Sequence, residues 1–272
     1  MSATPLPVPE GSPPIHCMRD GAVQWVVFNR PASMNAMTHE MEEILLALFA
    51  ELAASREVGA VVFTGAPGKR AAFMAGSDFG DLGASTGLDS SLALEAHAES
   101  VVAALEALAL PTVAAIAGPC IGAGAIFAAA CDVRIAAPSA RFGFPIARTV
   151  GNCLTVRNLS RLADLVGPGR TKDMIFSARL WQAPEMLETG LVREVSETDD
   201  ALLPRAAEVA LELASFAPLT LGATKEAMRR MREAAIGAIP DDDLIARCYT
   251  SADYAEGVSA FLEKRRPVWS GR

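Results

Sequence analysis

The sequence predicts an α/β fold with a buried sheet and a helical C-terminal region. Short apolar runs rich in β-branched residues alternate with longer segments whose apolar residues recur at helical spacing. The strand-like runs are continuously apolar, which is typical of a sheet covered on both faces. From about residue 198 onward no segment has a strand pattern. The chain has 272 residues, 51% of them hydrophobic and 21% charged, which is the composition of a globular protein with a large core.

The chain begins with residues 1–19, which we expect to be a loose arm. Its first fourteen residues are rich in Pro, Ser and Gly and lack the apolar run of a secretory signal. Residues 20–197 are expected to form the α/β core. Four runs have the length and composition of buried strands, namely Val23–Phe28, Ala60–Thr64, Thr112–Ile116 and Val133–Ala136.

The helical segments follow the strands in alternation. Thr38–Ala54 opens with a threonine in the N-cap position and acidic residues in the first turn, which is a helix-start signal. Residues 198–272 are expected to form a helical region packed on the core. The remaining helical patterns are Ser91–Leu110, Ala125–Ala130, Ala201–Ala214 and Thr224–Glu233. No change of composition marks a linker, so we expect one cooperative unit.

Composition also excludes several classes of function. A net charge of −8 argues against nucleic acid as the main partner. Five cysteines with no C-x-x-C pair are typical of reduced thiols, so we expect a cytoplasmic protein. With only three histidines, no metal site is expected, and no redox cofactor is indicated.

An uncharged stretch, Ala107–Cys131, is long enough to cross a bilayer. It is built from Ala and Gly, however, and is interrupted by Pro111 and by Gly118-Pro119. It lacks the density of large aliphatic residues that membrane insertion requires. A buried strand followed by a buried helix explains it better, and no membrane partner is expected.

Within this stretch, the turn Ala117–Gly124 (AGPCIGAG) leads into the predicted helix Ala125–Ala130. Backbone amides at the start of a helix are unpaired, and the helix dipole favours negative charge there. The spacing does not match the G-x-G-x-x-G fingerprint of dinucleotide-binding folds. A second small-residue turn, Met74–Asp78 (MAGSD), follows the strand at Ala60–Thr64 and lets backbone amides approach a ligand. By itself, Asp78 is better explained as a local helix cap than as a base.

These segments occur in the order, and with the neighbours, of a known family. Thr112–Gly151 contains a strand, a G-x-x-x-G-x-G turn, a small-residue helix, Cys-Asp, a second strand and Phe-Gly-x-Pro. Phe28–Met37 (FNRPASMNAM) and the terminal EGVSAFLEKRRP match further motifs. Over roughly residues 20–270 the chain resembles the crotonase (enoyl-CoA hydratase/isomerase) superfamily. The resemblance implies a spiral of ββα units with a C-terminal helical trimerisation region, and an acyl-CoA substrate whose coenzyme A is not a separate cofactor.

The resemblance also implies site residues. The backbone N–H groups of Ser77 and Ala123 correspond to the family's oxyanion hole, which stabilises a thioester enolate. Phe261 and Lys264 correspond to residues that reach the CoA of a neighbouring subunit, in a homotrimer or a dimer of trimers. The other positions implied to contact substrate are Met34, Ala36, Ala75, Asp78, Phe79, Leu82, Ile121, Gly124, Ile126, Pro145, Ile146 and Arg148.

Two substitutions separate this chain from the hydratases of the family. Ile126 and Ile146 stand where those hydratases carry carboxylates. Hydration needs a base that activates water and an acid that protonates the α-carbon, and isoleucine can be neither. The backbone donors are unaffected.

Several alternatives to hydration therefore stay open. Decarboxylation needs no base, and Arg148 or Asn152 would orient the departing carboxylate. Isomerisation needs one base, and Asp78 or Cys153 would have to serve, although an inert Cys153 thiol is the simpler reading. A third alternative is a non-catalytic acyl-CoA-binding protein. RNA binding, which a few crotonase-like proteins show, is disfavoured by the acidic charge.

Overall fold

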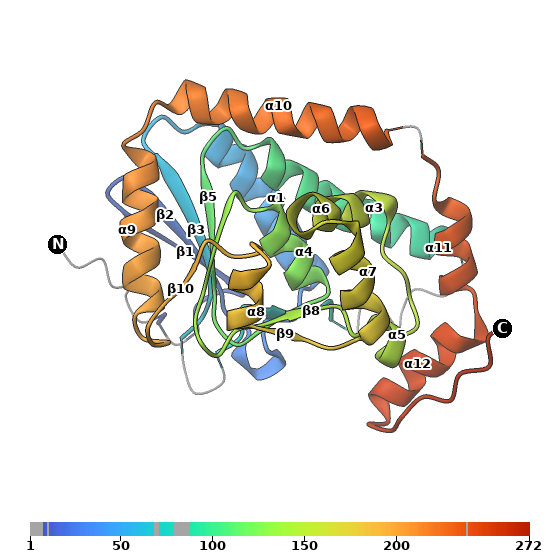
Figure 1. The fold of residues 1–272 in the computed structure, drawn as a ribbon. Coiled ribbons are helices and arrows are strands. Elements are labelled where there is room, and N and C mark those ends of the chain that lie inside the picture. The colour runs from blue at the N-terminus through green and yellow to red at the C-terminus, as the bar shows by residue number, and fades with distance from the viewer. Residues whose placement is uncertain (1–7, 10, 68–70, 79–87, 238) are drawn as a thin grey trace.

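Two sheets form the centre of the molecule (Figure 1). The computed structural model describes residues 8–9, 11–67, 71–78, 88–237 and 239–272. The larger sheet has six strands in the order β1-β2-β3-β5-β7-β10, in which β1 and β2 are antiparallel and all other neighbours are parallel. Its strands are β1 (Ile15–Asp20), β2 (Val23–Phe28), β3 (Ala60–Gly65), β5 (Thr112–Ile116), β7 (Val133–Ala136) and β10 (Glu194–Val195).

The smaller sheet has four short strands in the order β4-β6-β8-β9. The first three are parallel, and β9 is antiparallel to β8. Its strands are β4 (Met74–Ala75), β6 (Pro119–Ile121), β8 (Arg141–Gly143) and β9 (Trp181–Gln182). Each of β4, β6 and β8 follows a strand of the larger sheet in sequence, so the chain passes from one sheet to the other repeatedly.

Helices cover both faces of the larger sheet (Figure 1). On one face, Trp25, Val62 and Ala115 pack against Ala206 and Val209 of α9 (Leu202–Ala214). The other face packs on α1 (His39–Ala54), α3 (Leu88–Ala107) and α4 (Ala123–Ala130). Because successive side chains of a strand point to opposite faces, a strand covered on both sides must be apolar throughout. This confirms the α/β class with a buried parallel sheet.

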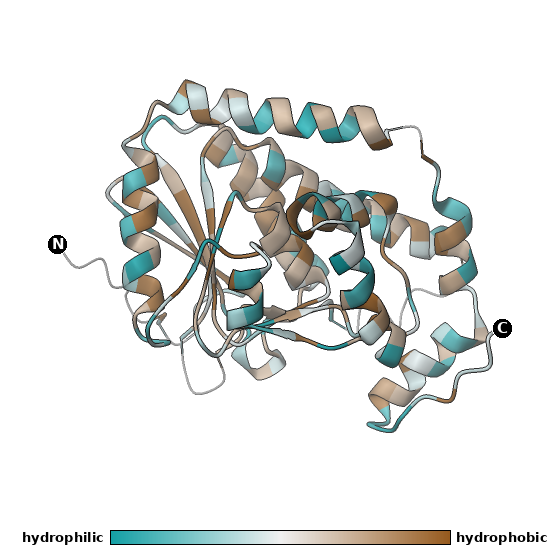
Figure 2. Cartoon of the chain, in the orientation of Figure 1, coloured by the Kyte–Doolittle hydropathy of each residue, from teal (hydrophilic) through white to brown (hydrophobic). Residues whose placement is uncertain are grey.

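The remaining helices follow around this core. Figure 2 shows apolar residues concentrated in the strands and α4, whereas α9 and α10 alternate polar and apolar positions. The elements are the 3₁₀ turn η1 (Pro31–Ser33), α5 (Ile146–Thr149), α6 (Val156–Val166), α7 (Pro168–Ser177), α8 (Ala183–Glu188), α10 (Pro218–Ile236), α11 (Asp242–Tyr249) and α12 (Ala252–Leu262). After β10, the described part of the chain contains helices and their connections but no further strand.

One sequence expectation needs correction. The loose arm does not extend to residue 19, because Ile15–Asp20 forms β1 along the edge of the larger sheet. Only Ile15 of this strand is buried, so its sequence lacks the apolar run that marked the other strands.

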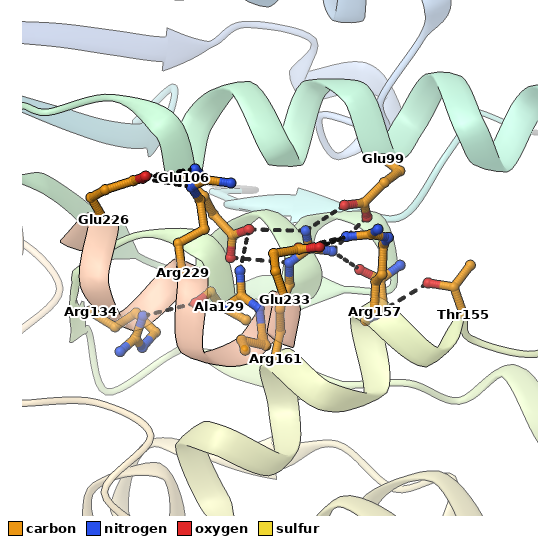
Figure 3. A network of polar contacts seen from close by, with 12 residues as sticks. Glu99, Glu106, Ala129, Arg134, Thr155, Arg157, Arg161, Glu226, Arg229 and Glu233 are labelled. Carbon is orange, nitrogen blue, oxygen red and sulfur yellow. Dashed lines mark hydrogen bonds and ion pairs between the residues drawn. The ribbon is translucent and has the colours of Figure 1, made fainter. Parts of the chain in front are cut away.

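A buried ion network ties α3 to α6 and α10 (Figure 3). The side chain of Arg161 on α6 is 2% exposed and forms ion pairs with two carboxylates of α3. Its guanidinium donates to both oxygens of Glu99 at 2.6 Å, and to both oxygens of Glu106 at 3.1 and 3.0 Å. Arg232 of α10 donates to Glu106 as well. Every charge of this network therefore has a partner of opposite sign.

We expect Arg161→Met to lower the free energy of unfolding by about 3–5 kcal/mol, because Glu99 then loses its cation at a largely buried site and Glu106 keeps only Arg232. Arg157→Met is the matched control. Arg157 is 42% exposed and pairs only with Glu233, so its loss should cost no more than about 1 kcal/mol. Urea unfolding of both variants measures the difference. Equal losses would show that burial of the network contributes nothing.

Candidate functional site

The carboxyl ends of β4, β6 and β8 open into a cavity of about 340 Å³. The pairing Ala75↔Ile121↔Gly143 sets these three strand ends side by side. The turns that follow them, together with α1, α3, α4, α11 and α12, supply the walls. Because three parallel strands end at one edge, segments distant in sequence meet here.

Two glycines shape the floor of this cavity. Gly76 and Gly122 follow the paired residues Ala75 and Ile121 and have φ of +93° and +56°. A Cβ on Gly122 would lie 3.5 Å from the Cα of Gly76, so the two turns are in direct contact. Glycine adopts such backbone angles without the penalty that a side chain would add. Both strands therefore turn sharply directly after the paired residues Ala75 and Ile121.

The next residue in each turn is Ser77 or Ala123. Among the described residues, neither N–H donates a hydrogen bond to a protein acceptor. The bonds Met37 N–H to Gly76 O (2.9 Å) and Asp78 N–H to Met37 O (2.7 Å) fix the turn on both sides of Ser77. Ala123 is the first residue of α4, where amides are unpaired and the dipole is positive. Two fixed donors thus line one cavity.

Ten of the oxyanion-hole and substrate-contact residues implied by the family resemblance line the cavity. They are Met34, Ala75, Ser77, Asp78, Ile121, Ala123, Ile126, Pro145, Ile146 and Phe261. Phe79 and Leu82 lie outside the described residues. Ile126 is 4% exposed and Ile146 is half-buried against the core, so aliphatic side chains stand at both positions where hydratases of the family have carboxylates.

Four expected contact residues do not line the cavity. Gly124 faces β4 instead, where a Cβ would come within 2.2 Å of the Met74 carbonyl oxygen. Ala36 is buried, and its carbonyl accepts a bond of 2.6 Å from Arg30. Lys264 is exposed beyond the end of α12. Lys264 was expected to reach the CoA bound to a neighbouring subunit, and a single chain does not test that contact.

Arg148 is the fourth, and its position follows from helix geometry. Ile146 and Thr149, three residues apart on α5, both face the cavity. Residues three apart share a helix face, whereas a residue two positions on points elsewhere. Arg148 is accordingly exposed to solvent, so it does not orient a carboxylate inside the cavity.

The surroundings of Asp78 and Cys153, the two residues considered as the base for isomerisation, make both of them poor bases. Asp78 pairs with Arg30, whose Nη2 lies 2.9 Å from Oδ2. Burial, followed by the neighbouring Cys248, raises the pKa of Cys153 to about 12. A thiol with such a pKa is almost entirely protonated near neutral pH, so Cys153 is a poor base.

A further carboxyl group, which the sequence analysis missed, lies in the cavity wall. Glu95 of α3 accepts a hydrogen bond from the hydroxyl of Tyr249 on α11, and Asn152 Nδ2 donates to the same hydroxyl at 3.2 Å. All three residues line the cavity. Glu95 and Tyr249 are 154 positions apart, and neither belongs to a motif. In sequence, Glu95 is one of three glutamates on the same face of α3, with Glu99 and Glu106, so no local signal singled it out.

The surroundings of this group favour its protonated form. Burial raises the pKa of Glu95; the Tyr249 hydrogen bond lowers it, and Glu99 and Asp241 raise it further. Burial and the adjacent Glu95 also raise the pKa of Tyr249. Tyr249 therefore stays a hydroxyl that donates to Glu95 whenever the carboxylate forms.

A cluster of imidazoles and carboxylates lies at the mouth of the cavity. The Nε2 of His97 is 3.4 Å from Oε2 of Glu42 and from Oε1 of Glu43, and the His39 ring is 4.6 Å from the His97 ring. Ligand atoms of His39, Glu43 and His97 lie within 4.8 Å of one another, a spacing at which they could hold a metal ion. Sequence spacing gave no sign of this group.

Comparisons with known proteins define the family. The model of the enoyl-CoA hydratase/isomerase family matches residues 19–272. A short-chain-enoyl-CoA hydratase of Clostridium acetobutylicum is 32% identical over 252 residues, covering 91% of this chain and 94% of that protein. The crystal structure of an enoyl-CoA hydratase/carnithine racemase from Magnetospirillum magneticum is 30% identical with a TM-score of 0.77, covering 96% of this chain and 97% of that one. The chain belongs to the enoyl-CoA hydratase/isomerase family, which confirms the crotonase resemblance.

A further structural likeness shows the fold alone. A methylmalonyl-CoA decarboxylase in complex with 2-nitronate-propionyl-CoA is 23% identical with a TM-score of 0.86, covering 95% of this chain and 98% of that one. As for membranes, no individual helix in the described part of the chain has the length and apolarity of a span. Only α9 and α10 meet those criteria jointly, and they are bent by 101° at their junction.

The Glu95 environment predicts a pH dependence of stability. A carboxyl whose pKa is raised on folding contributes stability that is full below its unfolded pKa of about 4.3 and is lost as pH rises through the folded pKa. We therefore expect Glu95→Gln to gain stability relative to the wild type as pH rises above about 4.3. Urea unfolding across this range measures it. Glu188→Gln, at an exposed site on α8, is the matched control, and parallel curves for Glu95→Gln and wild type would contradict the prediction.

Proposed function

We propose that this chain is an acyl-CoA enzyme that stabilises negative charge on a thioester oxygen between the N–H groups of Ser77 and Ala123. The observation that carries the proposal is the pair of unbonded amides held at neighbouring strand ends in one cavity. The hydratase and racemase names of the relatives support acyl-CoA as the substrate class. An amide that is already oriented needs no reorganisation as charge develops on the oxygen.

The same cavity argues against two-carboxylate hydration. Ile126 and Ile146 line it and offer no proton-transferring group. What remains is chemistry that depends on an enolate and on at most one proton carrier. Isomerisation fits because the described cavity wall still contains the Glu95 carboxyl group. The other candidate is a protein that binds acyl-CoA without turnover, which the aliphatic side chains at both positions would permit.

We also propose self-association through the C-terminal helices, as a trimer or a dimer of trimers. α10 has no buried residue and exposes Leu219, Met228 and Met231, an apolar surface that a partner subunit would cover. Phe261, at the cavity edge, is half exposed near the end of α12. Sedimentation of the purified chain distinguishes these assemblies from a monomer, which would refute this part of the proposal.

The amide pair can be tested through the glycine that positions it. We expect Gly122→Ala to reduce acyl-CoA turnover by about 10²–10³, because a side chain at φ of +56° shifts the Ala123 N–H, and losing one such donor costs about 2.7–4 kcal/mol. Gly21→Ala is the matched control. It has φ of +58° in an open turn where a Cβ meets nothing within 4 Å. Equal turnover in both variants, with both folded, would remove the amide pair from the mechanism.

A gain of function tests the role of the two isoleucines. Wild-type protein with crotonyl-CoA should lose the enone absorbance far more slowly than an ordinary hydratase, since each missing acid or base is worth about 10²–10⁴ in rate. The double variant Ile126→Glu, Ile146→Glu should hydrate faster than the matched Ile126→Gln, Ile146→Gln. Wild-type hydration at ordinary hydratase rates would show that another group replaces both carboxylates.

A further inference from the structure

We propose that Glu95 is the proton-carrying residue of this cavity, and that Tyr249 positions it and sets its pKa. This inference rests on the proposed function, because the proton it moves is the α-proton of a thioester held by Ser77 and Ala123. No motif of the sequence points to Glu95. The assignment comes from where the fold places this carboxyl group and from what surrounds it.

The first argument is position. Glu95 projects from α3 into the cavity that also contains both amides and both isoleucines. Its helix is fixed one turn further on, where Glu99 is bound by the buried Arg161. α11 packs across α3 and brings Tyr249 onto the carboxyl group. The carboxyl group is therefore held from two sides, as a proton-transferring group must be.

The second argument is the different pairing of the four acidic residues that line the cavity, Glu42, Asp78, Glu95 and Glu99. Glu42 lies beside His97, with 3.4 Å between Oε2 and Nε2. Glu99 is neutralised by Arg161, and Asp78 by Arg30. Glu95 has no ion pair with any cation in the described part of the chain, and only its Oε1 has a hydrogen-bond partner there. Its Oε2 is thus available to a substrate. A carboxylate bound to an arginine is a weak base, whereas one bound only to a hydroxyl keeps its basicity.

The third argument is electrostatic. Glu99 on α3 and Asp241 at the start of α11 are the acidic neighbours that oppose ionisation of Glu95. The other residues close to the Glu95–Tyr249 pair are Tyr254 of α12 and, after α5, Asn152 and Cys153. Burial and these charges raise the pKa of Glu95 above its usual value, which makes its carboxylate a stronger base than that of an ordinary glutamate.

The fourth argument is an unsatisfied acceptor. Oδ1 of Asn152 is buried beside this pair and has no hydrogen-bond partner among the residues that the structure describes. A buried acceptor without a partner costs about 1–3 kcal/mol, so such groups are usually paired by water or ligand. Asn152 also donates to Tyr249, so a donor bound at its Oδ1 would be coupled through Tyr249 to Glu95.

The step itself balances without a co-reactant. The Glu95 carboxylate takes a proton from C2 of the bound thioester, and the C–H electron pair moves to the carbonyl oxygen to form an enolate. The Ser77 and Ala123 amides hold that oxygen. The carboxylic acid then returns the proton to C2 or, in a 3-enoyl thioester, delivers it to C4, and the double bond shifts from C3 to C2. No oxidant, reductant or water is consumed.

The experiment uses but-3-enoyl-CoA with the full-length protein in D₂O. Proton NMR records deuterium entering C2 or C4, and calorimetry separately records binding of the thioester. We expect the wild type to exchange with a rate that rises with pH to a plateau. Glu95→Gln should still bind but exchange about 10²–10⁴-fold more slowly, and Glu95→Asp should retain part of the rate. Glu188→Gln should match the wild type.

Tyr249→Phe separates positioning from a purely structural role. Its hydrogen bond lowers the pKa of Glu95, so removing it should move the rising limb of the exchange profile to higher pH. Exchange at wild-type rate in Glu95→Gln would overturn the inference, as would a wild type that binds the thioester without exchange. Failure of the wild type to bind any CoA thioester would instead overturn the proposed function. Circular dichroism and urea unfolding confirm that each variant is folded.

Discussion

The contact between Gly76 and Gly122 is the constraint on which the site depends. A Cβ on Gly122 would lie in van der Waals contact with the Cα of Gly76, and a Cβ on Gly124 would clash with the Met74 carbonyl oxygen at 2.2 Å. These close approaches bring α4 directly onto β4 and set two main-chain amides at the same level of neighbouring parallel strands. The larger sheet supports this arrangement because three of its strands, β3, β5 and β7, are each followed in sequence by one short strand of the smaller sheet.

Much of the fold could be predicted from local pattern. Three of the four predicted strands have the observed bounds, and the fourth is one residue longer, because strands covered on both faces carry an uninterrupted apolar signal. β1 was missed because an edge strand with one buried residue has no such signal. The glycine turns identified the segments that meet at the cavity because their backbone angles demand glycine. Arg148 was misplaced because its orientation depends on a single helical turn that the sequence does not reveal.

The wall formed by α3 and α11 could not be predicted, and the reason is physical. Glu95 acquires its properties from residues far along the chain, including Tyr249, Asn152 and Asp241. In sequence it is one acidic residue on an amphipathic helix, indistinguishable from Glu99. What distinguishes the two carboxyl groups is Arg161, which is buried with Glu99 and leaves Glu95 without a cation. Charge pairing in this region therefore decides which acid remains chemically available.

The contribution of α11 and α12 to the cavity also has a consequence for biosynthesis. A ribosome releases the chain from its N-terminus, so the sheets, the glycine turns and Glu95 emerge well before Tyr249 and Phe261. Domains commonly begin to fold during synthesis, N-terminal segments first. A nascent chain would thus form the amide pair while the opposite wall is missing, with the apolar cavity open to solvent. Completion of the last helices would then close the site.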